Sequence, residues 1–531
     1  MKKEKFPIIT KIFLILFFTF SILFPIIKIF SNISLDAIKQ LIVEEQFKEA
    51  LLNSLLVTFI ASIISFVLAY VLAYAVNRSN IRFKKFFALV FTVPMLIPSI
   101  SHGIGLINLF GANGIFTKLF NYRFNLFGFN GILMGSILYS FPVAFLIFSN
   151  SFKYLDNTLY ELGDVVGMSK IQKFKQITFH YMKKSFISAF FAVFTMIFTD
   201  YGVPLAVGGK YLTLPYYLYK EVIGLLNFSN GAIIGLFLLV PAIISFLIDT
   251  FVKETNNLSS VTKKFYISKN KLRDILMYTV SIIVTMFLTI LLGSFIYLAF
   301  VKKFPYDMTF SLNHFTYVLS NDALSNIKNS IIISLFVSVL GTVIAFLCAY
   351  FSARVKSISS KLIHIISITT LAIPGIVLGL SYVFAFKGTI IYNTFAILII
   401  VNIVHFFASP YLMAYNSLSK LNDKYEEVGL TCGINRVLII KDVLIPNSYS
   451  TICEMLNYFF VNSMITISAI TFLYNVTTMP ASLLINKYDG YLMLEEAALV
   501  SVLILIINIA FKIITKLLFK GRKNNYEVQS I

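Results

Sequence analysis

The sequence predicts an all-α polytopic membrane protein with about 12 transmembrane helices, arranged as two parallel repeats of about six helices each. Three observations lead to this prediction: an apolar composition, a series of long apolar runs, and an internal duplication. The chain has 531 residues, of which 58% are hydrophobic and 13% are charged, and its mean hydropathy is +0.85. Soluble domains contain roughly 45–50% apolar residues, so this composition excludes an ordinary water-soluble protein.

The apolar runs are long enough to cross a bilayer. A helix needs about 20 apolar residues for about 30 Å of hydrocarbon, where it satisfies its own backbone hydrogen bonds. The first run follows the segment MKKEK but lacks a small-residue cleavage site, so we expect a retained span. Suitable runs occupy residues 8–30, 51–75, 87–109, 126–148, 186–207, 232–252, 275–300, 331–351, 362–386, 390–415, 451–474 and 494–517.

The basic residues predict the orientation of the chain. The formal net charge is +20, and the bases concentrate in alternate loops. Cytoplasmic loops carry the excess of Lys and Arg in membrane proteins, so we expect both termini in the cytoplasm. Nucleic acid is not an expected partner, because a basic patch for that purpose clusters on a soluble face.

The sequence offers no catalytic or metal-binding constellation. Its three cysteines have no paired spacing, and its five histidines are scattered along the chain. A membrane enzyme would bring such residues together at mutual spacings that suit catalysis. We therefore predict no catalytic residues, no metal site and no cofactor bound by this chain.

The two halves of the chain repeat each other. The segment NSLLVTFIASIISFVLAY at residues 53–70 matches NSIIISLFVSVLGTVIAF at residues 329–346, and IPSISHG at residues 97–103 matches IPGIVLG at residues 373–379. Repeats with an even number of spans share one orientation and leave a path between them. We expect a first repeat at residues 1–252, a polar cytoplasmic linker at residues 253–274 and a second repeat at residues 275–531.

One polar loop is also duplicated, at residues 160–182 and 425–446. Each copy contains an acidic residue expected to begin a short helix, a glycine that permits a sharp turn, and a polar residue suited to cap a second helix. These residues are Glu161, Gly167 and Ser169 in the first copy, and Glu427, Gly433 and Asn435 in the second.

The second helix of each copy is expected to be amphipathic. An amphipathic basic helix could lie on the bilayer surface, or its apolar side could dock into a partner. Two copies with the same spacing favour the docking device. The apolar positions are Ile171, Phe174 and Ile177 in the first copy, and Val437, Ile440 and Leu444 in the second.

The duplicated loop resembles the cytoplasmic coupling loop of permeases from ABC importers, which reads Glu-Ala-Ala, three residues, Gly, nine residues, Ile, two residues, Pro. His180 stands in the first copy where that pattern has Pro, and Leu162 and Val428 stand at one of the Ala positions. Gly163 and Gly429 stand at the second Ala position, and Val443 stands at the Ile position of the second copy. The residues that match the pattern are Glu161, Gly167 and Ile177 in the first copy, and Glu427, Gly433 and Pro446 in the second.

The resemblance implies a type I ABC importer permease fold, in which two permease domains are fused. In that family the loop inserts into a groove of an ATP-hydrolysing subunit. The implied partners are two copies of a cytoplasmic ABC ATPase and an extracytoplasmic solute-binding protein. The chain has no GxxxxGK[ST] phosphate loop, so ATP is expected to be used by the partner subunit.

Polar residues in the fifth and eleventh spans are candidates for a translocation path, because polar groups in spans are costly and usually face a cavity or a partner. Asp200 could instead make a structural hydrogen bond or cap a helix. Pro98 and Pro374 could kink the third span of each half for gating or only for close contact. The candidates are Asp200, Tyr201 and Pro204, with Asn462, Ser463, Thr466 and Ser468 in the second half.

The transported solute is less clearly indicated. The segments TDYGVPLAVGG and YFFVNSMITISAITFLY resemble the branch of fused permeases that serves ferric iron and 2-aminoethylphosphonate. We therefore expect one of these two solutes. The alternatives are a permease for thiamine or a polyamine and, more remotely, a secondary transporter, which would carry more ionisable groups deep in its spans.

Overall fold

The structure is a computed structural model that describes residues 5–31, 33–251, 265–320, 323–355, 357–422 and 424–527. Within these ranges, nine helices are long and apolar enough to cross a membrane, and the number rises to 11 if each of two bent pairs counts as one span. The predicted eleventh span contains a shorter helix, α25 (Tyr449–Ile465), of 17 residues. Part of the predicted linker, residues 253–264, lies outside the described residues.

The first half consists of helices that alternate between long spans and short connecting segments. In chain order they are α1 (Lys5–Phe18), η1 (Thr19–Leu23), α2 (Phe24–Ser31), α3 (Leu35–Val43), α4 (Glu45–Arg78), α5 (Lys84–Thr92), η2 (Val93–Leu96), α6 (Ser99–Phe110), α7 (Ile115–Phe120), α8 (Phe129–Tyr154), α9 (Asn157–Val165), α10 (Lys170–Lys173), η3 (Phe174–Phe179), α11 (His180–Phe198), α12 (Gly202–Val207), α13 (Leu214–Tyr219), η4 (Lys220–Gly224) and α14 (Phe228–Phe251).

The second half repeats this order and adds an antiparallel hairpin of β1 (Val301–Lys303) and β2 (Asp307–Phe310), in which Val301 pairs with Phe310. Its helices are α15 (Lys271–Ala299), α16 (Asn313–Ser320), α17 (Ala323–Arg354), α18 (Ile358–Thr369), η5 (Thr370–Ala372), α19 (Gly375–Phe386), α20 (Phe395–His405), α21 (Ala408–Leu418), α22 (Lys424–Thr431), α23 (Arg436–Ile439), η6 (Ile440–Leu444), α24 (Ile445–Asn447), α25, α26 (Ala481–Gly490) and α27 (Leu494–Glu527).

The third span of each half is broken where the sequence places its proline. Pro98 directly precedes α6, and Pro374 directly precedes α19. Proline has no N–H group and clashes with the carbonyl of the residue four before it, so a helix breaks there. In the second half the chain bends by 110° between the two segments. The predicted kinks are therefore present in both halves.

Three further predicted spans are not continuous helices. The fifth, expected at residues 186–207, ends with α11 at Phe198, because Pro204 and Gly202 oppose its continuation. The eleventh, expected at residues 451–474, ends with α25 at Ile465. The tenth, expected at residues 390–415, is divided into α20 and α21, which are bent by 54°.

The first span of each half crosses over to the other half. Helix α2 lies against α19, and α15 lies against α4, α5 and α6. One buried hydrogen bond supports each exchange: the Tyr382 hydroxyl donates to the Ser21 carbonyl at 2.7 Å, and the Asn108 side chain donates to the Ser294 carbonyl at 3.0 Å. The exchange ties the two halves into one core.

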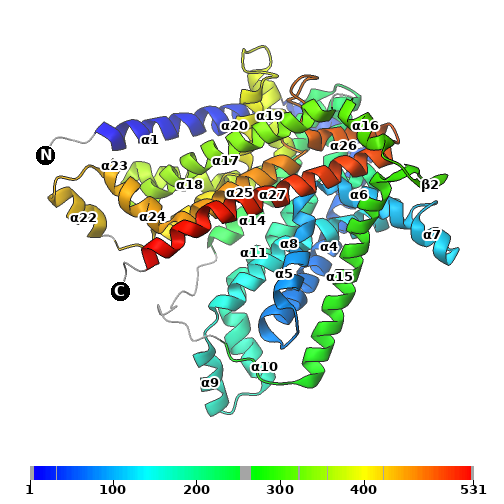
Figure 1. The fold of residues 1–531 in the computed structure, drawn as a ribbon. Helices are drawn as coiled ribbons and strands as arrows, with labels where there is room; N and C mark the ends of the chain where they lie inside the picture. Colours follow the sequence, from blue (N-terminus) through cyan, green and yellow to red (C-terminus); the bar gives the residue numbers. More distant parts are fainter. Residues whose placement is uncertain are drawn as a thin grey trace.

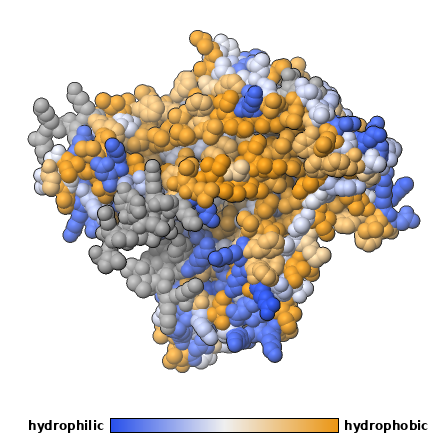
Figure 2. Space-filling view, viewed as in Figure 1, coloured by the Kyte–Doolittle hydropathy of each residue, from blue (hydrophilic) through white to orange (hydrophobic). Residues whose placement is uncertain are grey.

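The halves meet at one end and diverge at the other. In Figure 1, α9 and α10 lie at the bottom of one half, and α22 and α23 lie at the far left of the other. Between the halves, the hydroxyls of Ser101 and Ser501 are hydrogen-bonded at 2.8 Å, and the Asn508 side chain donates to the Leu96 carbonyl at 2.9 Å. Figure 2 shows a broad hydrophobic surface over α17, α25 and α27, with hydrophilic residues toward the ends of the molecule.

Candidate functional site

The two duplicated loops, which we call the first loop (residues 160–182) and the second loop (residues 425–446), begin inside short helices. Glu161 lies within α9, which starts at Asn157 and is capped by Asp156 through its bond from the Thr158 amide at 3.0 Å. The expectation that Glu161 begins its helix is therefore wrong, because Asp156 supplies the cap one turn earlier. Glu427 lies in the first turn of α22, as predicted.

Glycine terminates both helices in the same way. Gly167 and Gly433 adopt φ angles of +76° and +72°, in the left-handed region that side chains disfavour. The next amide then returns to the helix: Met168 donates to the Gly163 carbonyl, and Ile434 donates to the Gly429 carbonyl, each at 2.8 Å. This arrangement is the Schellman motif, and it confirms the predicted sharp turn in both loops.

The predicted caps of the second helices are also confirmed. Ser169 forms a capping box with Gln172, in which each side chain accepts from the other residue's amide. Asn435 accepts from the Val437 amide at 3.2 Å. Each cap is followed by one short α-helical segment and then a π-helical segment, η3 or η6.

A second pair of glycines lets the two helices of each loop approach closely. A Cβ atom added at Gly429 would lie 2.5 Å from Cδ1 of Ile439, and one added at Gly163 would lie 3.3 Å from Cδ1 of Ile177. The second loop is therefore more tightly closed than the first. This contact also explains why Ile177 is buried, since it faces α9 rather than solvent.

The apolar positions of the second helices divide between burial and exposure, so the apolar side predicted to dock into a partner is only partly exposed. Ile177, Ile440 and Leu444 are buried against the chain itself. The exposed apolar side chains extend onto the first helix and the turn of each loop, where they offer a surface for contact outside the spans. They are Leu162, Val165, Val166, Ile171 and Phe174 in the first loop, and Tyr425, Val428, Ile434, Val437 and Leu438 in the second.

The loops differ where they return to the membrane. Val443 is half-buried and its carbonyl accepts from the Asn447 side chain at 2.7 Å. Pro446 lies in the three-residue helix α24, after which Ser448 separates α24 from α25. His180, at the corresponding position, begins α11 directly after η3, so residues 170–198 run as one helix.

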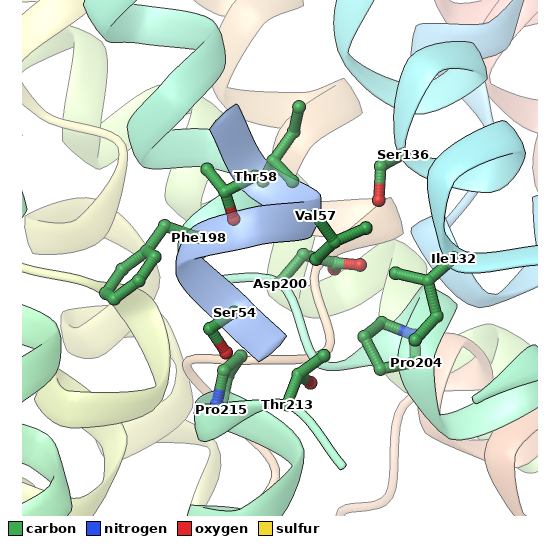
Figure 3. A pocket seen from close by; sticks show the side chains of 11 residues that line it. Ser54, Val57, Thr58, Ile132, Ser136, Phe198, Asp200, Pro204, Thr213 and Pro215 are labelled. Atoms are coloured by element: carbon green, nitrogen blue, oxygen red, sulfur yellow. The ribbon is translucent and has the colours of Figure 1, made fainter. Parts of the chain in front are cut away.

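Asp200 is a helix cap. Its carboxylate accepts from the Ser99 hydroxyl at 2.6 Å and from the Val203 amide at 3.0 Å, and it is 8% exposed. It also lines a small cavity of the first half, with room for about one water molecule, in which Ser54, Thr58 and Thr213 take part. Figure 3 shows its carboxylate between Val57 and Ile132. Pro204 lines the same cavity.

Tyr201 points to the other half of the molecule. Its side chain is fully buried, and its hydroxyl bonds to the Thr471 hydroxyl and the Asn486 side chain, both at 3.1 Å. It stacks on Tyr219, with 5.0 Å between ring centroids. Tyr201 therefore joins the two halves, whereas Asp200 stabilises the broken fifth span.

The candidates of the second half do not line the Asp200 cavity. The Asn462 side chain donates to the Tyr458 carbonyl within its own helix. The Thr466 carbonyl accepts from the Ser482 hydroxyl at 2.6 Å. Ser463 is buried, and the Ser468 hydroxyl lies 2.4 Å from where a Cβ at Gly375 would stand. The path residues predicted from sequence are thus divided among several local environments.

The chain matches a family described as binding-protein-dependent transport system inner membrane component, over residues 65–254 and 341–523. These two stretches together include more than half of the chain, and each contains one of the duplicated loops. The chain belongs to this family. It is a multi-pass, all-α membrane protein with two copies of the family's domain.

Known members of the family are similar over most of this chain. The ferric transport system permease protein FbpB of Actinobacillus pleuropneumoniae is 24% identical over 75% of this chain and 60% of its own length. The putative ferric transport system permease protein FbpB 1 of Haemophilus influenzae is 25% identical over 90% of this chain and 79% of its own length. The chain thus spans less than two thirds of the first relative.

The structure also reveals a pair of positions in each half to which we assigned no function from sequence. Asn53 donates to the Leu212 carbonyl at 3.1 Å, and Ser54 accepts from the Leu214 amide at 2.6 Å. In the second half Asn329 donates to the Thr477 and Met479 carbonyls at 2.8 and 3.2 Å, and Ser330 accepts from the Ala481 amide at 2.7 Å. The repeated Asn-Ser pair, already visible in the duplication, tethers the segment that follows each broken span.

Within the described ranges, no group of three or more His, Cys, Asp or Glu side chains is placed to hold a metal ion.

Proposed function

We propose that this chain is the permease subunit of an ATP-driven importer and forms the membrane path for a small solute. The observation that carries the proposal is the pair of loops with the same Schellman turn, each at the free end of its half and each with exposed apolar side chains. If an ATPase moves the two halves of the chain relative to each other, each half needs a surface that the ATPase can contact.

We further propose that each loop docks on one copy of a cytoplasmic ABC ATPase, and that an extracytoplasmic binding protein delivers the solute. Glu161 and Glu427 are exposed beside the apolar contact side chains and suit a polar rim around them. ATP is then bound and hydrolysed by the ATPase, and this chain needs no cofactor of its own. The proposed units are residues 1–252, a linker at 253–274, and residues 275–531.

Contacts near the chain ends support cytoplasmic termini. In α1, Lys11 donates to the Ser357 hydroxyl at 2.7 Å, and Phe519 near the C-terminus contacts Tyr449 at 6.2 Å between ring centroids. Tyr449 begins α25 directly after the second loop and α24, and Ser357 lies three residues after Arg354, whose side chain binds Glu426 of that loop. We propose that the end of the second half that carries the second loop faces the cytoplasm of a bacterial cell, as the positive-inside rule suggests.

Ferric iron is the solute that we propose. The two relatives described above are named as ferric transport permeases, and similarity to this group favours iron over 2-aminoethylphosphonate, thiamine or a polyamine. Ferric iron would be a cargo in transit and not a resident cofactor.

The test is a detergent pull-down of the tagged chain with partners identified by mass spectrometry, combined with uptake of radioactive ferric iron. The native chain should recover an ABC ATPase and support uptake, and the double variant Glu161→Arg, Glu427→Arg should lose both. Lys361→Met, which changes an exposed base of α18 that belongs to neither loop, is the matched control. Failure of well-folded native protein to recover an ATPase would refute the proposal and favour a secondary transporter.

A further inference from the structure

Each half has an arginine at the end of its second span, and both side chains are buried. Arg78 is the last residue of α4 and is 3% exposed. Arg354 is the last residue of α17, and its side chain is 1% exposed. The same number of residues separates Asn53 from Arg78 and Asn329 from Arg354, so the duplication places the two arginines at corresponding positions. A buried arginine needs partners, because an unpaired buried charge is strongly destabilising.

Arg354 binds the second loop through an ion pair. Its guanidinium forms two bonds to the Glu426 carboxylate, of which Nε to Oε1 measures 2.8 Å. The same group donates to the carbonyls of Leu421 at 2.6 Å and Asn422 at 2.7 Å. A bidentate pair between Arg and a carboxylate is strong and geometrically specific. Arg354 thus connects the end of α17 to the start of α22.

Arg78 binds the first loop through aromatic rings. Its guanidinium carbon lies 3.6 Å from the ring centroid of Phe265 and 5.6 Å from that of Tyr160, and its Nη2 donates to the Phe152 carbonyl at 3.1 Å. Tyr160 packs on Phe265 and bonds to the Thr178 hydroxyl at 2.7 Å. Arginine stacks readily on aromatic faces. Arg78 therefore joins α4 to α9 and to the segment that leads into the second half.

The two anchors occupy equivalent places in the loop. Tyr160 and Glu426 directly precede Glu161 and Glu427. In each loop the earlier residue faces the chain's own arginine, whereas the glutamate after it is exposed. In each loop, therefore, one residue contacts the second span and the next residue is exposed on the side that a partner could reach.

We propose that Arg78 and Arg354 are positioning residues that fix each loop to the second span of its half, so that movement of the loop moves the span. This inference rests on the proposed function for its transport consequence, but the anchoring itself is a property of this chain. The second anchor depends on a carboxylate and the first on aromatic rings, so each is broken by a different substitution.

The first test is hydrogen–deuterium exchange of the full chain in nanodiscs, without partners. Arg354→Met should speed exchange in residues 424–431 at least tenfold and leave residues 157–165 unchanged, and Arg78→Met should do the reverse. Glu426→Gln, which preserves the size of the side chain, should reproduce the Arg354→Met result, and Lys361→Met should change neither loop. The anchoring would be overturned if exchange stayed unchanged in both loops of the arginine variants. It would also be overturned if Glu426→Gln sped exchange equally in both loops.

The second test measures coupling in the reconstituted complex. Arg354→Met should still recover the ATPase in a pull-down, but solute uptake per ATP hydrolysed should fall at least tenfold, and the exchanged pair Arg354→Glu, Glu426→Arg should restore part of it. Normal uptake per ATP in Arg354→Met would refute the coupling role. A native chain that recovers no ATPase refutes the proposed function instead, and the exchange experiment then still decides the anchoring.

Discussion

The first and second loops have nearly the same backbone but different side-chain anchors. Both turn through a left-handed glycine and both begin their second helix at a polar cap. The second loop closes on Gly429 and holds Glu426 by an ion pair, whereas the first leaves more space at Gly163 and surrounds Arg78 with aromatic rings. The comparison teaches that the positive φ at the turn accepts few residue types, whereas either an ion pair or aromatic contacts can hold the loop in place.

The return to the membrane differs as well. The first loop continues into α11 without interruption, whereas Pro446 and Ser448 separate the second loop from α25. A continuous helix transmits a displacement along its axis, and a break permits a change of direction. We therefore expect the second loop to depend more on Arg354 and Glu426 for its coupling, since its connection to α25 is less direct.

Replacement of the turn glycines should have the largest effect. Gly433→Val and Gly167→Val each place a β-branched residue at a positive φ, which costs roughly 1–2 kcal/mol or more. No atom lies within 4 Å of an added Cβ at either position, so the backbone conformation alone opposes the change. Uptake should fall at least tenfold in both variants while the chain still reaches the membrane.

The matched controls are Gly433→Asn and Gly167→Asn, because Asn tolerates the left-handed region. They should retain most of the uptake. If Val and Asn variants behave alike, the turn conformation is not what matters at these positions.

An intermediate effect should separate the loops at their second glycine. Gly429→Ala brings Cβ to 2.5 Å from Ile439, against 3.3 Å from Ile177 for Gly163→Ala. Overfilling a close contact typically costs about 1–3 kcal/mol, so Gly429→Ala should weaken recovery of the ATPase more than Gly163→Ala does. Pull-down yield measures the difference, and Gly429→Ala combined with Ile439→Ala should restore the yield. Equal losses in the two single variants would contradict the tighter closure of the second loop.

The smallest effect should come from the Asn tethers. Asn329→Ala removes bonds to two carbonyls, and Asn53→Ala removes a bond to one. A buried group left without its partner costs about 1–3 kcal/mol, so Asn329→Ala should lower the thermal midpoint of the purified chain more than Asn53→Ala. A larger shift for Asn53→Ala would show that the two tethers are not equivalent.

Local features of the fold and the site were predictable from the sequence. Gly167, Gly433, Ser169 and Asn435 act within a few residues of themselves, so their roles follow from backbone chemistry. The break at Phe406 was missed, because the run around it is apolar enough for a continuous span. Asp200 was placed among the path candidates, and only its bonds to Ser99 and Val203 distinguish it as a cap.

The sequence by itself determined the membrane class, the duplication and the two loops, since composition, repeated motifs and turn residues depend on short-range chemistry. The tertiary structure decided the exchange of first spans between halves and the anchoring of each loop by Arg78 or Arg354. Glu426 lies far along the chain from Arg354, and Phe265 lies even farther from Arg78. Only the folded path of the chain brings such residues together, so that Arg354 meets a carboxylate and Arg78 meets aromatic rings.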